Sequence, residues 1–206
     1  MKRRKPPPRS ARRSPKQARS RETIHLIFET TTRILLREGP SKLNTNHVAA
    51  RAGISVGTLY QYFPNKRAIL VAMARLELDS TISAIEAALA SGEGDAADPV
   101  RLTIGALIAA FRKHRRARLI TFQTLMADGL EPEIERRLDE IAQLIVHRAP
   151  DPRVRALSPQ AAFVLTRAVN GVLVSAAQDG SPHLGSATLE DDLVRLVHGF
   201  LRHDAA

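Results

Sequence analysis

The side chains best suited to binding chemistry lie close together, between residues 58 and 66. Thr58, Tyr60 and Tyr62 supply hydroxyl groups, Gln61 supplies an amide, and Lys66 supplies a positive charge. A glutamine amide can make two hydrogen bonds to the edge of an adenine. Hydroxyls and ammonium groups suit phosphate oxygens. Together these groups predict an interface with double-stranded DNA, with Gln61 as the best candidate for a direct base contact.

Two short helices and a tight turn are expected to position these groups, within residues 43–70. Asn44 can cap the first helix and Ser55 the second, because their side-chain oxygens can accept N–H groups of a first turn. Gly53 can adopt the left-handed backbone of a sharp turn, and Pro64 ends the second helix. This pattern indicates a helix-turn-helix, although glycine and apolar spacing alone would also fit an ordinary pair of crossed core helices.

The letters GTLYQYF at residues 57–63, followed after one residue by Asn65 and Lys66, resemble the signature of the TetR/AcrR family of bacterial transcriptional regulators. The resemblance runs from about Thr23 to Met73, and beyond that it is only architectural. It implies that Lys66 contacts the DNA backbone and that Thr45 and Asn46 contact phosphates or bases. It also implies a homodimer, formed through the last two helices, and a small-molecule effector.

Other residues of the same stretch are also expected to contact DNA. Gly57 would let the backbone approach a phosphate, and a methyl group of Val56 or Thr58 could touch a thymine methyl. One tyrosine could instead chiefly pack, and Gln61 could contact nothing. The predicted contact residues are Thr45, Asn46, Ser55, Val56, Gly57, Thr58, Tyr60, Gln61, Tyr62 and Lys66.

Charge is concentrated at the start of the chain. The 206 residues carry a net charge of +10, and residues 1–21 hold ten of the 31 Lys and Arg residues and no acid, so the remaining basic and acidic residues balance. We expect residues 1–20 to be a disordered basic arm that gathers onto phosphates or enters the minor groove. A solubilising tail without specific contacts is the alternative.

Composition limits the other classes of function. The chain has no cysteine, which excludes disulfides and thiol chemistry and fits a cytoplasmic bacterial protein. It has no uninterrupted run of 18 apolar residues, so we expect no membrane span. It has no HExxH, phosphate-binding glycine loop or GxSxG motif, and its seven histidines are scattered. We therefore expect no enzyme activity, no cofactor and no metal.

The rest of the chain predicts an all-α protein. A helix-turn-helix domain over residues 21–68 would be joined by a long helix, about 65–89, to a helical effector-binding and dimerisation domain over residues 69–206. Residues 160–177 are apolar nearly all round, and a last amphipathic helix follows. The surplus apolar surface predicts a dimer interface, unless the core of one monomer absorbs it. The interface candidates are Leu165, Ala168, Val172, Leu193, Leu196, Val197 and Phe200.

An effector cavity is expected between helices of the second domain. The candidates are Phe111, Phe122, Met126 and Asn170, each of which could instead be plain core. Arg115, Arg116 and Arg118 could attract an anionic effector or form a solvated basic surface. The resulting hypothesis is a homodimeric repressor that binds a palindromic operator and is released by a small molecule. The alternatives are a sequence-tolerant architectural DNA-binding protein that uses the basic arm, and a helical metabolite-binding protein or enzyme.

Overall fold

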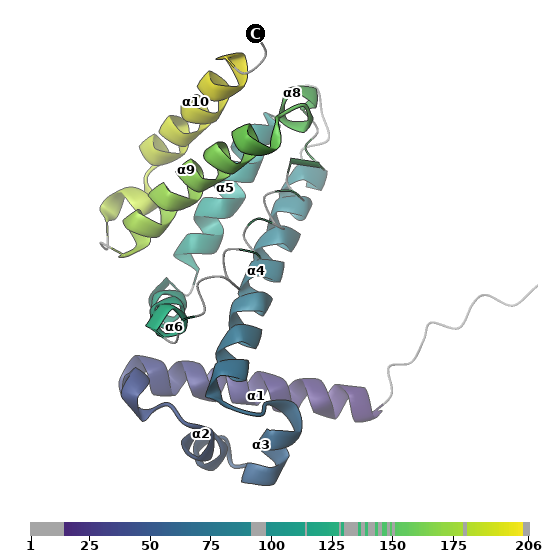
Figure 1. Ribbon diagram of the computed structural model, residues 1–206, viewed down its shortest axis with the longest axis vertical. Coiled ribbons are helices and arrows are strands. Elements are labelled where there is room, and N and C mark those ends of the chain that lie inside the picture. Colours follow the sequence, from purple (N-terminus) through teal and green to yellow (C-terminus); the bar gives the residue numbers. More distant parts are fainter. Residues whose placement is uncertain are drawn as a thin grey trace, which may run out of the picture. The chain divides into compact units, whose positions relative to one another are not determined.

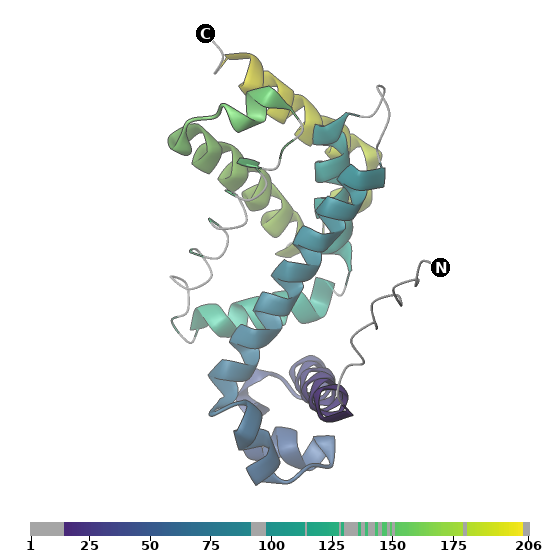
Figure 2. The same cartoon turned by 90° about the vertical axis from the view of Figure 1, so that its right-hand side faces the viewer.

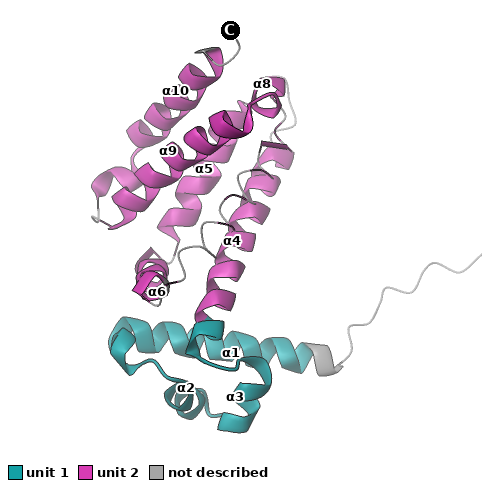
Figure 3. Ribbon diagram, viewed as in Figure 1, with its two compact units in different colours: residues 1–69 teal, residues 70–206 magenta. Residues whose placement is uncertain are grey.

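A computed structural model describes residues 15–91, 98–113, 115–127, 129, 136, 139, 143, 146–147, 149, 151–178 and 181–203. These residues form helices and turns without a strand, as Figure 1 shows, which confirms the all-α class. The chain divides into two compact units, Met1–Ile69 and Leu70–Ala206 (Figure 3). The first unit holds the helix-turn-helix, and the second holds the larger helical domain.

Helix α1 spans Pro15–Arg37 and begins six residues before the expected start at Arg21. Proline suits a first helical turn because its fixed φ is helical and its missing N–H has no partner there anyway. The residues that follow have good helix propensity, and the Thr23 hydroxyl donates to the Arg19 carbonyl at 2.9 Å. Residues 15–20 are therefore helical and not part of the expected arm, whose residues 1–14 lie outside the described part of the chain.

The two helices of the motif have the expected ends. After the short η1 (Pro40–Lys42), the Asn44 side chain accepts the His47 N–H at the start of α2 (Thr45–Ala52). Gly53 closes α2 with a left-handed φ of 68°. The Ser55 side chain accepts the Thr58 N–H at 2.9 Å and so caps α3 (Val56–Tyr62). All three local predictions are confirmed.

The core of the first unit lies between these helices. Ile27 and Ile34 of α1, Val48 of α2 and Leu59 of α3 are at most 1% exposed. The Phe28 ring packs against the ring of Phe63, the residue that ends α3, with 5.7 Å between centroids. Burial of large aliphatic side chains at about 25 cal/mol per Å² is the main force that holds such short helices together.

One carboxylate also joins α1 to α2. Glu38, just past the end of α1, accepts a hydrogen bond from Arg51 Nη2 at 2.6 Å and shares a second, at 2.8 Å, with His47 Nε2. His47 and Arg51 are one turn apart on α2, so both reach the same acid. The hydrogen bond from Arg51, and then that from His47, lowers the pKa of Glu38.

The second unit is built on a long helix and a three-helix core. Asn65 caps α4 (Lys66–Ser91), which begins in the first unit and continues into the second. Helices α5 (Pro99–Arg112), α9 (Pro159–Gln178) and α10 (Ala187–His203) pack side by side, as Figures 1 and 2 show. Their shared core includes Ile104 of α5, Leu173 of α9 and Leu201 of α10. The remaining elements are α6 (Arg115–Ala127), α8 (Pro152–Arg155) and η2 (Pro182–Gly185).

Polar side chains fix the pairing of α5 with α10. Asp98, the N-cap of α5, accepts the Val100 N–H on one oxygen and is hydrogen-bonded on the other to His198 of α10 at 2.9 Å. One turn along, Arg101 bonds to two acids of α10, Glu190 and Asp191. The two helices are therefore joined at both an N-cap and an ion-pair site, next to their apolar contact.

Helix α9 is long and apolar enough to cross a membrane when judged by length and composition alone. In the structure its inward residues Leu165, Val169 and Leu173 are buried in the core with α5 and α10. The apolar character of this side is therefore explained by packing within the chain. The outward side keeps Phe163 and Val172 exposed.

The ion pair at Glu38 predicts a pH-dependent contribution to stability. A carboxyl whose pKa is lower in the folded state stabilises the protein above its unfolded pKa and loses that contribution as the pH falls through the folded pKa. Glu38→Gln should therefore lower the free energy of unfolding at neutral pH. The difference from wild type should vanish under acid conditions, when measured by urea unfolding across that pH range. Glu29→Gln, on α1 and more exposed than Glu38, is the control, and an equal loss there would contradict the assignment.

Candidate nucleic-acid interface

One face of α3 is exposed while the opposite face is buried. Leu59 is fully buried in the unit's core, whereas Val56, Tyr60 and Gln61 are exposed. Tyr60 is 50% exposed. Tyr62 is half-buried. The buried Leu59 holds the helix against the core, and the exposed side offers the Tyr60 hydroxyl and the Gln61 amide to a partner.

A hydrogen bond joins the two helices of the motif on this exposed side. The Thr45 hydroxyl, at the first position of α2, and the Tyr60 hydroxyl of α3 lie 3.2 Å apart. Both residues were predicted as DNA contacts separately, but their pairing was not predicted, because the residues are fifteen apart and meet only when the two helices cross. The bond places two hydroxyls that are predicted to contact DNA next to each other.

The start of α3 is held by its own hydroxyls. Ser55 Oγ caps the helix and also lies 2.8 Å from the Thr58 hydroxyl. These two predicted contacts are thus bonded to each other in the unbound chain. Gly57, between them, is exposed, and a Cβ added there would meet only Ser55 Oγ at 3.8 Å, an ordinary contact. Packing within the chain therefore does not require glycine at this position.

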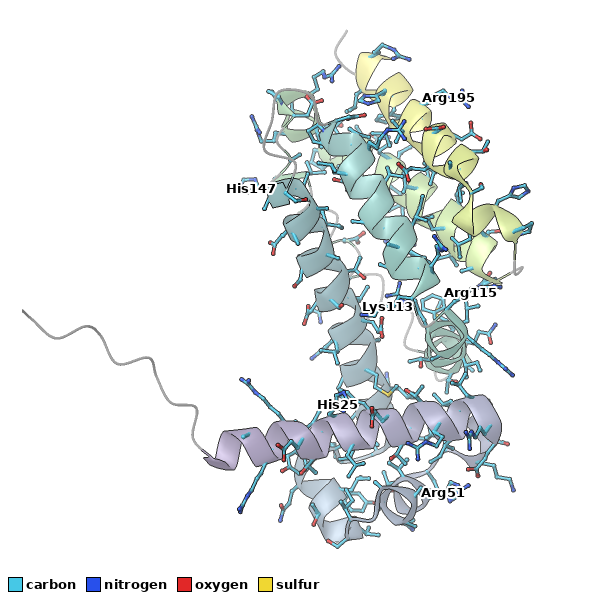
Figure 4. The ribbon with its side chains drawn as sticks, turned by 180° about the vertical axis from the view of Figure 1, so that it is seen from behind. His25, Arg51, Lys113, Arg115, His147 and Arg195 are labelled. Carbon is cyan, nitrogen blue, oxygen red and sulfur yellow. The ribbon has the colours of Figure 1, made fainter. Side chains whose placement is uncertain are left out.

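The remaining predicted contacts lie at two helix starts. Asn46 is exposed in the first turn of α2, and Lys66 is half-buried at the first position of α4. Residues 39–76 contain five Lys and Arg residues and no acid. Figure 4 shows one of these cations, Arg51, on α2, where it bonds to Glu38. This interaction was not predicted from the sequence, because Glu38 and Arg51 meet only when α1 and α2 cross.

The predicted effector residues all lie in the second unit. Phe111 packs against the core of this unit, and Phe122, Met126 and Asn170 are half-buried. Helix α6, which carries Phe122 and Met126, packs against α9, which carries Asn170. No group of His, Cys, Asp or Glu side chains within the described ranges is arranged to hold a metal ion.

Three of the predicted dimer residues lie in the core of the second unit. Leu165, Leu193 and Val197 are at most 8% exposed and belong to the monomer's own core. Each is next in sequence to an exposed position, so an apolar pattern alone does not separate the buried side of the helix from the exposed side. Among the predicted residues, Ala168, Val172 and Leu196 are exposed and Phe200 is half-buried. The structure adds two exposed apolar side chains, Phe163 and Val164.

Comparison with known proteins agrees with this geometry. Residues 27–73 match the family model described as "Bacterial regulatory proteins, tetR family". No curated protein matches the chain by sequence. Several solved structures resemble the whole fold at low sequence identity, which makes them informative about architecture.

Three of these structures illustrate the likeness. The multidrug binding protein EbrR, solved with imidazole, has a TM-score of 0.62 and 17% identity, over 86% of this chain and 93% of that one. A TetR family transcription regulator from Marinobacter aquaeolei VT8 has a TM-score of 0.61 and 21% identity, over 87% and 95%. The SmeT–triclosan complex has a TM-score of 0.59 and 18% identity, over 85% and 91%.

The family match coincides with the helix-turn-helix described above, and the solved relatives share both helical parts of the fold. The resemblance seen in the sequence is thereby confirmed. Residues 27–73 thus match the TetR-family model over the helix-turn-helix, and the chain as a whole has the fold of TetR-family transcriptional regulators.

Proposed function

We propose that the chain is a homodimeric repressor that binds a palindromic operator through α3 and is released by a small molecule. The exposed face of α3 is the observation that supports operator binding. It offers Tyr60 and Gln61 beside an acid-free, basic stretch of chain, above a fully buried Leu59. Side chains that reach base edges give sequence choice, while the surrounding cations give affinity.

The outward face of α9 supports the dimer. Phe163, Val164, Ala168 and Val172 are exposed at helical spacing, and a Cβ added at the neighbouring Gly171 would meet no atom of the chain. Small residues allow two helices to approach closely, and exposed apolar side chains gain free energy when a second copy covers them. A two-fold dimer would present two α3 helices to half-sites about 34–36 Å apart.

Release by a small molecule is supported by the division into two units. SmeT was solved with triclosan and EbrR with imidazole, and both share this fold. A ligand that binds one conformation of the second unit more tightly shifts the population toward it. Because α4 runs without a break from Lys66 into the second unit, it connects that unit to the motif. A coupling of about 1–3 kcal/mol would give a usable switch.

The second candidate is a sequence-tolerant architectural protein, favoured by the ten basic residues among residues 1–21. Footprinting on genomic fragments separates the two functions. Protection of discrete palindromes supports the repressor, whereas uniform protection supports the architectural protein and contradicts the operator.

Gly57→Ala tests the recognition face with two opposed readouts. Alanine has the higher helix propensity, so the free energy of unfolding should rise by up to about 1 kcal/mol. The new methyl group would stand between the α3 backbone and the DNA, so operator affinity should fall. Chemical unfolding and fluorescence anisotropy measure the two effects. A variant that is more stable and binds DNA as well as wild type would show that Gly57 does not lie against the DNA.

Lys66→Ala tests the phosphate contact at the start of α4. Loss of one phosphate contact should weaken binding to all sequences and lower the slope of log K against log salt by about 1. The control is Lys113→Ala, an exposed lysine of the second unit that removes the same charge. Anisotropy titrations at several salt concentrations give the slopes, and an unchanged slope for Lys66→Ala would count against its role.

Val172→Glu tests the dimer face. A carboxylate at the centre of an apolar interface would be buried without a partner, so the variant should sediment as a monomer and lose operator affinity. Leu76→Glu is the matched control, because Leu76 is an exposed leucine on a different helix, α4. If both variants remain dimeric in analytical ultracentrifugation, the α9 face is not the interface.

A further inference from the structure

Arg118 connects three helices of the second unit. It lies on α6, its Nη2 donates to Glu77 Oε2 of α4 at 2.8 Å, and its guanidinium carbon lies 5.3 Å from the centroid of the Phe111 ring of α5. The Arg118 side chain is only 20% exposed. A single cation thus holds α6 against α4 and α5 in a partly dehydrated setting.

The hydrogen-bonding edge of this guanidinium is only half used. The Nε and Nη2 groups of an arginine point the same way and match the two oxygens of one carboxylate. Here Glu77 supplies a single bond to Nη2, while Arg118 Nε is buried without a hydrogen-bond partner. A buried donor without an acceptor is costly, so an acceptor that reaches Nε gains free energy.

The segment around Arg118 carries a high local positive charge. Residues 112–118 read RKHRRAR, with five Lys and Arg residues and no acid. Figure 4 labels Lys113, which caps the end of α5, and Arg115, the first residue of α6. Arg115 Nε donates a hydrogen bond of 2.7 Å to the Ala177 carbonyl, near the end of α9. Lys113 and Arg116 are exposed. This charge raises the local concentration of small anions.

The neighbours of the guanidinium select among anions. The Phe111 ring lies against it, and Phe111 and Leu119 both pack on the unit's hydrophobic core. An anion that approaches Nε must give up water beside these apolar groups. A singly charged group with an apolar body loses less hydration there than a phosphate dianion, and its body covers apolar surface.

We propose that Arg118 anchors an amphipathic carboxylate, whose two oxygens occupy Nε and Nη2 while Glu77 is displaced. This inference rests on the proposed ligand-controlled function and names the chemical class of its effector. Displacement frees a residue of α4 from α6, so the ligand favours a conformation in which these two helices are no longer joined by the ion pair.

Three variants test whether the paired Nε and Nη2 groups of Arg118, and not its positive charge alone, bind the carboxylate. Arg118→Lys keeps a cation that can pair with Glu77 and lie over Phe111, but it lacks Nε and the planar fork. Glu77→Gln removes the competing carboxylate and leaves Arg118 intact. Arg116→Gln removes an exposed charge from the same helix and is the matched control.

The experiment titrates the full-length protein with hexanoate, decanoate and tetradecanoate, with decanol and inorganic phosphate as comparison probes, by calorimetry and thermal unfolding. We expect at least one carboxylate to bind and raise the Tm, and decanol and phosphate to do neither. Arg118→Lys should weaken that binding by at least about tenfold, Glu77→Gln should strengthen it, and Arg116→Gln should change it little.

Three results would overturn the proposal: no carboxylate binds either wild type or Glu77→Gln, decanol or phosphate binds as tightly, or Arg118→Lys binds as well as wild type. Thermal unfolding without probe shows whether each variant is folded. Operator binding without probe is measured in parallel, so failure of the DNA-binding function is seen separately from failure of the carboxylate site.

Discussion

Complete burial of Leu59 beneath α3 is the contact on which the binding face depends. An isolated helix of seven residues is far too short to be stable in water, so α3 keeps its shape only through its neighbours and its ends. Leu59 fixes its inner side, and the Ser55 side chain satisfies an N–H of its first turn. Tyr60 then bonds to Thr45 of α2 on the outer side. The groups expected to meet DNA are thus held from beneath and from one side before any DNA is present.

The local features of this unit could be predicted because they depend on neighbouring residues. Caps at Asn44 and Ser55 and the left-handed Gly53 follow from side chains that act within three residues. The start of α1 was missed because a run of basic charge was taken as a sign of disorder, although those residues have good helix propensity. The bonds of Glu38 to α2 could not be predicted, since they depend on how two helices cross.

The second unit shows a different limit. A helix that is apolar on all sides must be covered on all sides, but its sequence does not say which side its own chain covers. In α9 the buried set Leu165, Val169 and Leu173 is offset by one residue from the exposed set Val164, Ala168 and Val172. Both sets have the four-residue spacing of a helix face. Only the positions of α5 and α10 decide between them.

The bond between Asp98 and His198 also has a consequence for synthesis of the chain. It joins residues 100 apart in sequence, and the apolar core beside it likewise needs α5 and α10 together. The first unit is made from contacts among its first 69 residues, which favours early folding as the chain leaves the ribosome. Val100, Ile104 and Ile108 must then wait until α10 has been made before it covers them. A chain that stops short of α10 would carry a folded DNA-binding unit and an aggregation-prone helix.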